Sequence, residues 1–518
     1  MGYFQRPAIQ TASRGCGALS VAASFDFQAA FKATGTRDVM RNKVELQDYE
    51  PVTPSSGRRH LSSPATEDDS PRIRAIEPLV AVNASTNAKS VFTPAPVLSR
   101  SLPRESQKAP ATNSILKRGH SLTYLGLFVF TFLVYFRPYE LFPSLAWLSR
   151  SALVLAVLTL AVFIPTQLGL ENRLSANLRE VKLVLALLFT GLLSVPLALE
   201  PSRAFQSLVE FFKVVVIFIV MVNVVRTEKR LRGLILLVLF VSCVLSLAAL
   251  NDYAHGNLAM RGQRIAGLIG GLFSNPNDLA LHLVTMIPIS FTLLLGSRGV
   301  LLKILYLGCT LLLVAGMVAT FSRAGFIGFV CVIGVLVWKL AGRNRVLFGA
   351  LALTMVIAAV TLAPSAYRSR LTTTGDDSSI ARTDDLRRSI LVAVRHPIFG
   401  VGMENYILYS NTNHATHNSY TQVAAEMGLL GFLFYLGFLI TPFKGLRSIE
   451  RTTNTTKRKP AVYYLAIGLQ AGLAGYMVVS FFSSVAYVWY AYYLVAYAVC
   501  LQRLTFADTT PKPRTISI

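Results

Sequence analysis

Two histidines gather with amide and hydroxyl side chains in the segment 414–420, directly before a long apolar run. Titratable groups at a membrane boundary are costly to keep, so they usually serve a function there. A neutral imidazole can accept a proton from a hydroxyl near neutral pH, which makes His417 a candidate general base and His414 its nearby competitor. Asn418 and Ser419 follow His417 and would support it. A lone loop histidine more often has no chemical role, so the hypothesis depends on its neighbours.

Arginines close to apolar runs are the second feature that could carry chemistry. Arg261 and Arg264 lie in a polar segment, and Arg323 stands between two apolar runs in the sequence TFSRAG. An arginine near hydrocarbon needs an anionic partner or a water-filled cavity. Its planar guanidinium suits phosphate, which it can bind through two parallel hydrogen bonds. The alternative is a structural arginine that pairs with a helix C-terminus or extends its charged head to water.

The segment 273–278, with the sequence FSNPND, directly precedes another apolar run. Asn275 and Asn277 suit an N-cap, and a proline suits the first turn of a helix. A structural role is therefore the stronger interpretation, in which these residues support a site without touching substrate. The sequence contains no HExxH, no Cys–His ligand spacing and no Gly-rich phosphate loop. We therefore expect no metal, no other cofactor and no ATP-driven step.

The elements that must position these residues are membrane helices. Hydrophobic residues make up 53% of the 518 residues and charged residues 15%, and apolar runs of membrane-spanning length recur after residue 120. The runs are continuous, so we predict an all-α, polytopic membrane protein. The net charge of +24 fits basic cytoplasmic loops better than nucleic-acid binding. About twelve spans are expected, near 121–136, 148–166, 182–199, 208–225, 233–250, 279–297, 300–320, 324–340, 346–363, 427–443, 461–480 and 485–502.

The composition divides the chain into a tail and a membrane domain. Residues 1–118 are rich in Ser, Thr, Pro and Arg, which predicts a disordered cytoplasmic tail, with an organelle transit peptide as the alternative. The membrane domain then covers 119–505, and a short cytoplasmic tail covers 506–518. With both termini inside, the basic residues collect in inner loops, and the long loop 364–426 with its histidines faces the periplasm.

Within that long loop, one segment has helical periodicity. Residues 385–394 place Leu386, Ile390, Ala393 and Val394 on one face, which is typical of a helix lying on a membrane surface.

Four segments of the chain together carry a family pattern: FSNPNDLALHL (273–283), TFSRAGFIGF (320–329), HPIFGVGMENY (396–406) and HNSYTQVAAEMGLLGFLFYL (417–436). They resemble the O-antigen ligase and O-antigen polymerase superfamily of bacterial envelope glycosyltransferases. The resemblance covers roughly 250–440, and its last segment is the most specific. The opening 124–140 resembles ligase-type members more weakly, and residues 1–118 have no counterpart.

The resemblance implies a multi-pass enzyme of the bacterial inner membrane with a periplasmic site. Such an enzyme transfers a glycan from undecaprenyl diphosphate to a hydroxyl on a glycan, lipid or protein acceptor, with inversion and without metal or nucleic acid. The family's essential histidine falls on His417, and the arginine of its S-R-[AG] motif falls on Arg323. The arginine ahead of its N-P-N motif falls on Arg264, although Arg261 fits almost as well.

A transporter or flippase of lipid-linked envelope glycans is the competing hypothesis. Twelve spans suit a transporter. Against it stand the lack of repeat symmetry, the lack of charged residues at mid-helix and the confinement of polar residues to one face.

Overall fold

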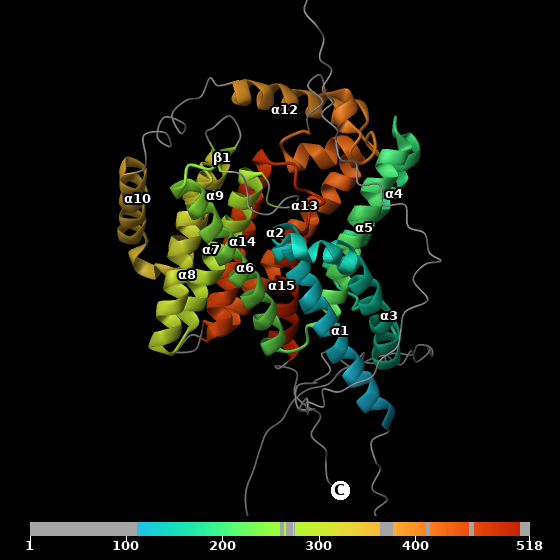
Figure 1. Ribbon diagram of the computed structural model, residues 1–518, viewed down its shortest axis with the longest axis horizontal. Coiled ribbons are helices and arrows are strands. Elements are labelled where there is room, and N and C mark those ends of the chain that lie inside the picture. The colour runs from blue at the N-terminus through green and yellow to red at the C-terminus, as the bar shows by residue number, and fades with distance from the viewer. Residues whose placement is uncertain are drawn as a thin grey trace, which may run out of the picture. The chain divides into compact units, whose positions relative to one another are not determined.

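The computed structural model describes residues 111–259, 264–265, 273, 275–362, 377–410, 415–454 and 460–507 (Figure 1). All of them belong to the larger of the two units into which the chain divides, residues 49–518. The predicted N-terminal tail up to residue 110, most of the C-terminal tail, Arg261 and His414 lie outside the described residues.

The described chain is almost entirely helical. A two-residue antiparallel pair, β1 (Leu258–Ala259) and β2 (Arg264–Ile265), is the exception. Short 3₁₀ turns link several helices: η2 (Pro143–Arg150), η3 (Val195–Leu197), η5 (Gly342–Asn344), η6 (Tyr406–Tyr409) and η7 (Ser480–Phe482). The α-helices are α1 (Ala111–Phe136), α2 (Pro138–Leu141), α3 (Ser151–Glu171), α4 (Arg179–Ser194), α5 (Pro201–Val224), α6 (Glu228–Ala254), α7 (Pro276–Gly296), α8 (Val300–Ala319), α9 (Arg323–Leu340), α10 (Arg345–Leu362), α12 (Asp377–Arg395), α13 (Ser419–Thr453), α14 (Ala461–Val479) and α15 (Trp489–Ala507).

The all-α polytopic membrane fold is confirmed. Ten helices within the described residues are long and apolar enough to cross a membrane. The two further predicted spans coincide with α10 and α15. Helix α15 is less apolar because four tyrosines, Gln502 and Arg503 lie along it. In α10, several side chains lie outside the described residues.

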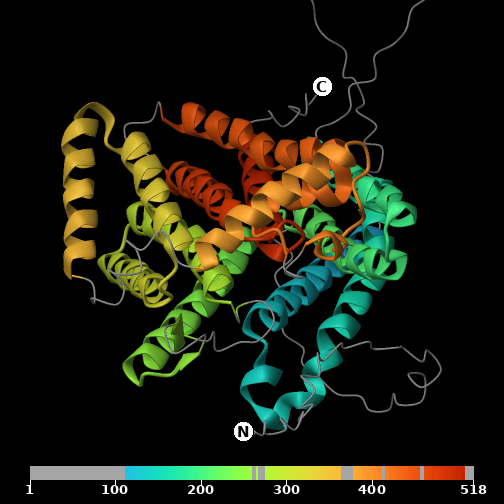
Figure 2. The same ribbon diagram turned by 90° about the horizontal axis from the view of Figure 1, so that it is seen from above.

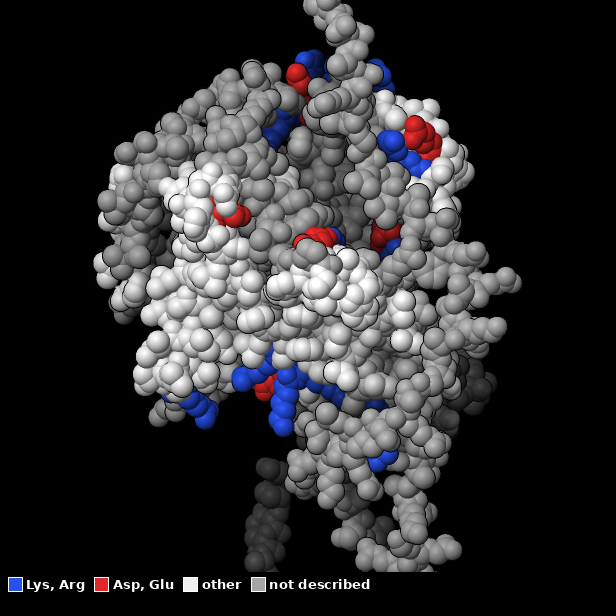
Figure 3. Space-filling view, viewed as in Figure 1, with Lys and Arg blue, Asp and Glu red and all other residues white. Residues whose placement is uncertain are grey.

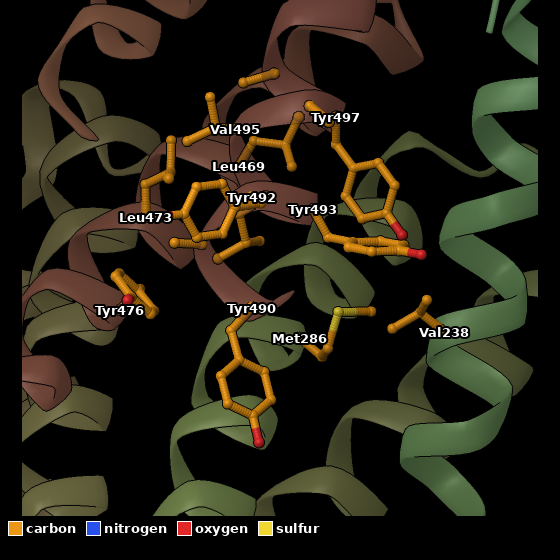
Figure 4. Packing of buried hydrophobic residues seen from close by; sticks show 14 of the residues in the cluster. Val238, Met286, Leu469, Leu473, Tyr476, Tyr490, Tyr492, Tyr493, Val495 and Tyr497 are labelled. Carbon is orange, nitrogen blue, oxygen red and sulfur yellow. The ribbon is translucent and has the colours of Figure 1, made fainter. Parts of the chain in front are cut away.

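The centre of the helical bundle is built from α5, α7 and α14, whose most apolar windows are 67–72% buried. Helix α14 packs against α7, α9, α13 and α15. Glycines permit this close approach, since a Cβ at Gly468 would collide with the Thr292 side chain and one at Gly475 would lie 2.7 Å from Val332. Figure 4 shows the tyrosines of α15 packed with Met286 of α7 and Leu469 and Leu473 of α14.

The two ends of the helices differ in charge. Lys and Arg gather along the lower edge of the molecule in Figure 3, beneath a broad uncharged belt. That lower edge holds the N-termini of α6, α8 and α14 and is called here the basic end. The N-termini of α7, α9 and α13 lie together at the other end, called here the site end.

Helix α12 crosses over the site end of the helices, and Figures 1 and 2 agree on this placement. The sequence predicted a helix in this part of the long loop, and the structure contains it. Asp385, Ser389 and Val392 are buried, because the helix packs on α13 and η6 through its more polar side. Ile390 and Val394 of the apolar face are exposed, and the expectation that this face lies on a membrane surface stays a prediction.

Candidate functional site

A sharp turn between α8 and α9 places Arg323 at the first position of a helix. Phe321 adopts a left-handed backbone conformation with φ 52°, which is uncommon for a bulky residue. Ser322 then caps α9, its hydroxyl accepting a hydrogen bond from the Gly325 amide at 3.2 Å. Arg323 is half-buried and takes part in interactions at this end. The helix N-terminus beside it carries a partial positive charge, which favours an anionic ligand.

The N-terminus of α7 is tied directly to that turn. Asn275 is the N-cap of α7, and its side chain accepts a hydrogen bond from the Asn277 amide at 2.9 Å. Asn277 in turn accepts a hydrogen bond from the Ser322 hydroxyl at 2.9 Å. The predicted N-cap role of Asn275 is therefore confirmed. The contact between Asn277 and Ser322 brings the NPN segment beside Arg323, which the sequence spacing did not predict.

The histidine segment is held by the start of α13 and by the chain between η7 and α15. Asn418 is the N-cap of α13 and accepts hydrogen bonds from the amides of Tyr420 and Thr421 at 2.8 and 3.1 Å. The Ser419 hydroxyl donates to the Ser483 carbonyl at 2.6 Å and accepts from the Val485 amide at 2.9 Å. Asn418 and Ser419 are thus buried anchors.

His417 itself stands just before the helix, in a conformation that these anchors fix. Its φ is 51°, a left-handed value that costs on the order of 1–3 kcal/mol for a residue other than glycine. His417 is half-buried and takes part in an interaction with other residues. Such strain persists only where the surrounding structure enforces it, and it is concentrated at functional sites.

Helix α14 supports both the histidine and the arginine. The Tyr420 hydroxyl, in the first turn of α13, donates to the Met477 carbonyl of α14 at 2.7 Å. Val479 at the end of α14 packs against Gly328 of α9, one turn and a half after Arg323. His417 and Arg323 therefore lie at helix starts that pack on the same last two turns of α14.

Helix α13 is broken close to the site. Gly428 has φ 73° and ψ −174°, so Ser419–Met427 forms a half-helix separate from the long remainder. The free carbonyls of Ala425 and Glu426 accept hydrogen bonds from the amides of Val401 and Gly402, both at 2.9 Å. The sequence predicted a loop up to residue 426 and a span from 427. The helix instead begins eight residues earlier, and the break lies where the span was expected to start.

The segment 396–406, with the sequence HPIFGVGMENY, fastens the half-helix to the rest of the site end. The Asn405 side chain is buried and accepts a hydrogen bond from the Glu200 amide, at the start of α5, at 2.8 Å. The Tyr406 hydroxyl donates to the Asp385 carbonyl of α12 at 2.9 Å. Burial and the nearby Asp385 raise the pKa of Tyr406 to about 12, so its phenol stays protonated as a donor. This segment therefore has a structural role: it connects the start of α5, the helix α12 and the half-helix of α13.

A buried carboxyl at the far end of the half-helix has a partner that sequence reasoning missed. Glu426 lies at the end of the half-helix, 3% exposed, and its Oε2 accepts a hydrogen bond from the Tyr487 hydroxyl at 2.9 Å. An acidic residue inside an apolar run is a sequence signal. Tyr487 gives no comparable signal in the sequence, because it lies in a stretch rich in aromatic residues.

The second arginine of the predicted site is only partly placed. The backbone of Arg264 pairs with Ala259 in the short β-sheet, and its side chain lies outside the described residues, as does Arg261. The neighbouring Ile265 is fully buried, so this strand is fixed to the bundle close to α6. Among the described residues, no three His, Cys, Asp or Glu side chains are grouped as metal ligands.

Comparison with known proteins identifies the central part of the chain. Residues 308–436 match the family model described as O-antigen ligase. The match runs from α8 into the second part of α13 and includes both Arg323 and His417. No curated protein matches the chain. The resemblance to the O-antigen ligase and polymerase superfamily is confirmed by this match.

Proposed function

From the O-antigen ligase match, we propose that this chain transfers a glycan from an undecaprenyl-diphosphate carrier to a hydroxyl acceptor at the periplasmic face of the bacterial inner membrane. One observation carries the proposal. Arg323 and His417 both lie within the matched segment, and both stand at helix starts that pack on the last turns of α14. An anion-binding group and a candidate base thus belong to one end of the bundle.

The proposed reaction is a single displacement at the anomeric carbon. His417 removes the proton of the acceptor hydroxyl, whose oxygen forms the new glycosidic bond. The bond between the anomeric carbon and the diphosphate oxygen breaks, and the diphosphate leaves with the electron pair, so the configuration inverts. Arg323, with Arg264 or Arg261 as the second arginine, stabilises the negative charge that grows on the leaving group.

Asn275, Asn277, Asn418 and Ser419 act as positioning residues in this proposal. Their side chains form hydrogen bonds with helix termini and with neighbouring chain segments. They hold the two helix starts that carry Arg323 and His417. Substrate positioning of this kind matters because small misplacements of reacting groups lower rates strongly.

The decisive experiment uses the purified full-length chain in lipid nanodiscs with an undecaprenyl-diphosphate-linked glycan and hydroxyl acceptors. Formation of glycosylated acceptor together with released undecaprenyl diphosphate supports the proposal. Movement of intact lipid-linked glycan across the bilayer, with no covalent product, would identify a flippase instead. In cells, loss of the gene should leave lipid-linked glycan accumulated on the outer leaflet.

We expect Arg323→Lys to lower the transfer rate by about 10- to 100-fold at unchanged protein level. Lysine keeps the charge but loses the two parallel hydrogen bonds to phosphate, and one hydrogen bond to a charged group contributes ~1.5–3 kcal/mol. Arg387→Lys, an exposed arginine on α12 at the site end, is the matched control and should keep full activity. Full activity in Arg323→Ala would remove Arg323 from the site.

We expect the site end to be periplasmic and the basic end cytoplasmic, because basic residues collect on the cytoplasmic side. A cysteine at Asp384, exposed on α12, should react with a membrane-impermeant maleimide in intact cells. A cysteine at Asn454, exposed after α13, should react only after permeabilisation. The parent chain controls for the native cysteines. The opposite pattern would place the candidate site in the cytoplasm and reject the proposed donor.

A further inference from the structure

A cavity of about 940 Å³ opens at the basic end, far along the helices from His417. It lies between the first turn of α6, the last turn of α7, the first turns of α8 and the start of α14. Its size is in the range of sites that hold organic ligands. The mechanism proposed above uses none of its residues.

The charged residues of the cavity leave a positive excess. Arg232, Arg298 and Lys303 line it together with one carboxylate, Glu228. Glu228 pairs with Arg232 at 2.9 Å. Within the described part of the chain, Arg298 and Lys303 form no ion pair. Three cations against one anion leave two uncompensated positive charges, Arg298 on the link between α7 and α8 and Lys303 in the first turn of α8.

The N-terminus of α8 adds hydrogen-bond donors beside these two side chains. Its N-cap is Gly299, which offers no side-chain acceptor to the amides of the first turn. Leu302 of that turn lines the cavity. Backbone amides at a helix start, with the partial positive charge of the helix, bind phosphate groups well. A helix N-terminus alone would not indicate a binding site. Arg298 and Lys303 beside it favour the same kind of ligand, an anion.

Most of the remaining lining residues are apolar, beside the polar Thr292 and Ser297, and these apolar side chains favour a lipid over a soluble anion. Leucine, isoleucine and valine side chains contribute, and Tyr306 and Tyr464 stand among them; the aliphatic residues are Ile235, Leu236, Leu293, Leu295, Leu302, Val462 and Leu465. A small soluble anion would leave these side chains in contact with water. An acyl chain next to a phosphate matches both parts of the lining, and basic pockets between membrane helices are suited to acidic lipid headgroups.

We propose that this cavity binds the phosphate headgroup of an anionic glycerophospholipid. Arg298 and Lys303 hold the phosphate, the first-turn amides of α8 add hydrogen bonds, and the aliphatic lining receives the upper part of an acyl chain. The lipid joins the ends of α7, α8 and α14 at the end of the bundle that does not carry the candidate site. This inference is independent of the proposed glycan transfer.

The test compares lipid binding by the full-length protein and a double variant. The purified, delipidated chain is titrated with mixed micelles of dioleoylphosphatidylglycerol, with dioleoylphosphatidylcholine micelles and with inorganic phosphate, and binding is followed by native mass spectrometry and thermal unfolding. We expect phosphatidylglycerol alone to bind and to raise the unfolding midpoint. The variant Arg298→Gln/Lys303→Gln should bind it on the order of 10- to 100-fold more weakly, since two charged contacts are lost.

A matched control separates a built site from general surface charge. Arg179→Gln/Lys182→Gln removes two exposed positive charges at the first turn of α4, outside the cavity, and should bind phosphatidylglycerol normally. Equal weakening in both double variants would overturn the proposal, as would equal binding of phosphatidylcholine. Equal stabilisation by inorganic phosphate would assign the site to a free anion. A photoreactive phosphatidylglycerol should crosslink to the α7–α8 segment of the unchanged protein, and crosslinks confined to other segments would also overturn it.

Discussion

His417→Ala should abolish detectable glycan transfer while the protein still inserts in the membrane and still binds the lipid-linked donor. Loss of a general base typically costs ~10²–10⁴ in rate, and arginine contacts to the diphosphate do not depend on the imidazole. Asn418 and Ser419, which anchor the start of α13 through their own side chains, remain in this variant. The measurement is the transfer rate in nanodiscs beside a separate donor-binding assay.

Two histidine controls make this result specific. His396→Ala changes an exposed ring that packs on Tyr409 at the site end, and it should keep near-normal transfer. His414→Ala should be much milder than His417→Ala, because the resemblance to the family assigns the essential histidine to His417. If His417→Ala transfers glycan at a near-normal rate, the mechanism is wrong. Glu426, buried beside Tyr487, and Glu404 would then be the next candidate bases.

Gly428→Ala should be the most damaging single change to the fold of the site end. The backbone values of φ 73° and ψ −174° are accessible almost only to glycine. A Cβ there would also collide with the Ile398 carbonyl and lie 2.7 Å from the Phe399 amide, and backbone atoms cannot rotate away. We expect a loss of roughly 3 kcal/mol or more, seen as a lower unfolding midpoint in detergent and low yield.

A second glycine provides the control for this change. Gly334→Ala lies in the interior of α9, where a Cβ would meet nothing within 4 Å. Alanine is favoured over glycine by about 1 kcal/mol inside a helix, so this variant should be as stable as the parent or more so. Equal midpoints for the two variants would show that the break at Gly428 is not required by the native packing.

Hydropathy was sufficient to predict the membrane helices, because burial in hydrocarbon imposes a length and composition that can be read locally. Helix capping could also be predicted from the local sequence, since Asn275 caps α7 as its position before Pro276 indicated. Inside the long loop, periodicity predicted the helix α12 but not the polar side chains Asp385 and Ser389 that it buries, because that burial depends on the packing of α12 on α13 and η6.

The contacts that assemble the candidate site join residues far apart in the chain, so no local pattern contains them. Asn277 meets Ser322, and Glu426 meets Tyr487. The break at Gly428 was hidden for a related reason. A glycine in an apolar run reads as part of a membrane helix, and only the segment 396–406 packed against it reveals the interruption.

The interruption of α13 affects how His417, which lies just before this helix, responds when the helix tilts. Membrane helices tilt to adapt to the thickness of the surrounding bilayer. An unbroken helix would transmit such a tilt along its whole length. Here the half-helix Ser419–Met427 takes its terminal hydrogen bonds from Val401 and Gly402, and Leu429 donates to the Pro397 carbonyl. We therefore expect tilting of the long second segment of α13 to be absorbed at Gly428, so that the orientation of His417 follows the segment 396–406 rather than the tilt of that segment.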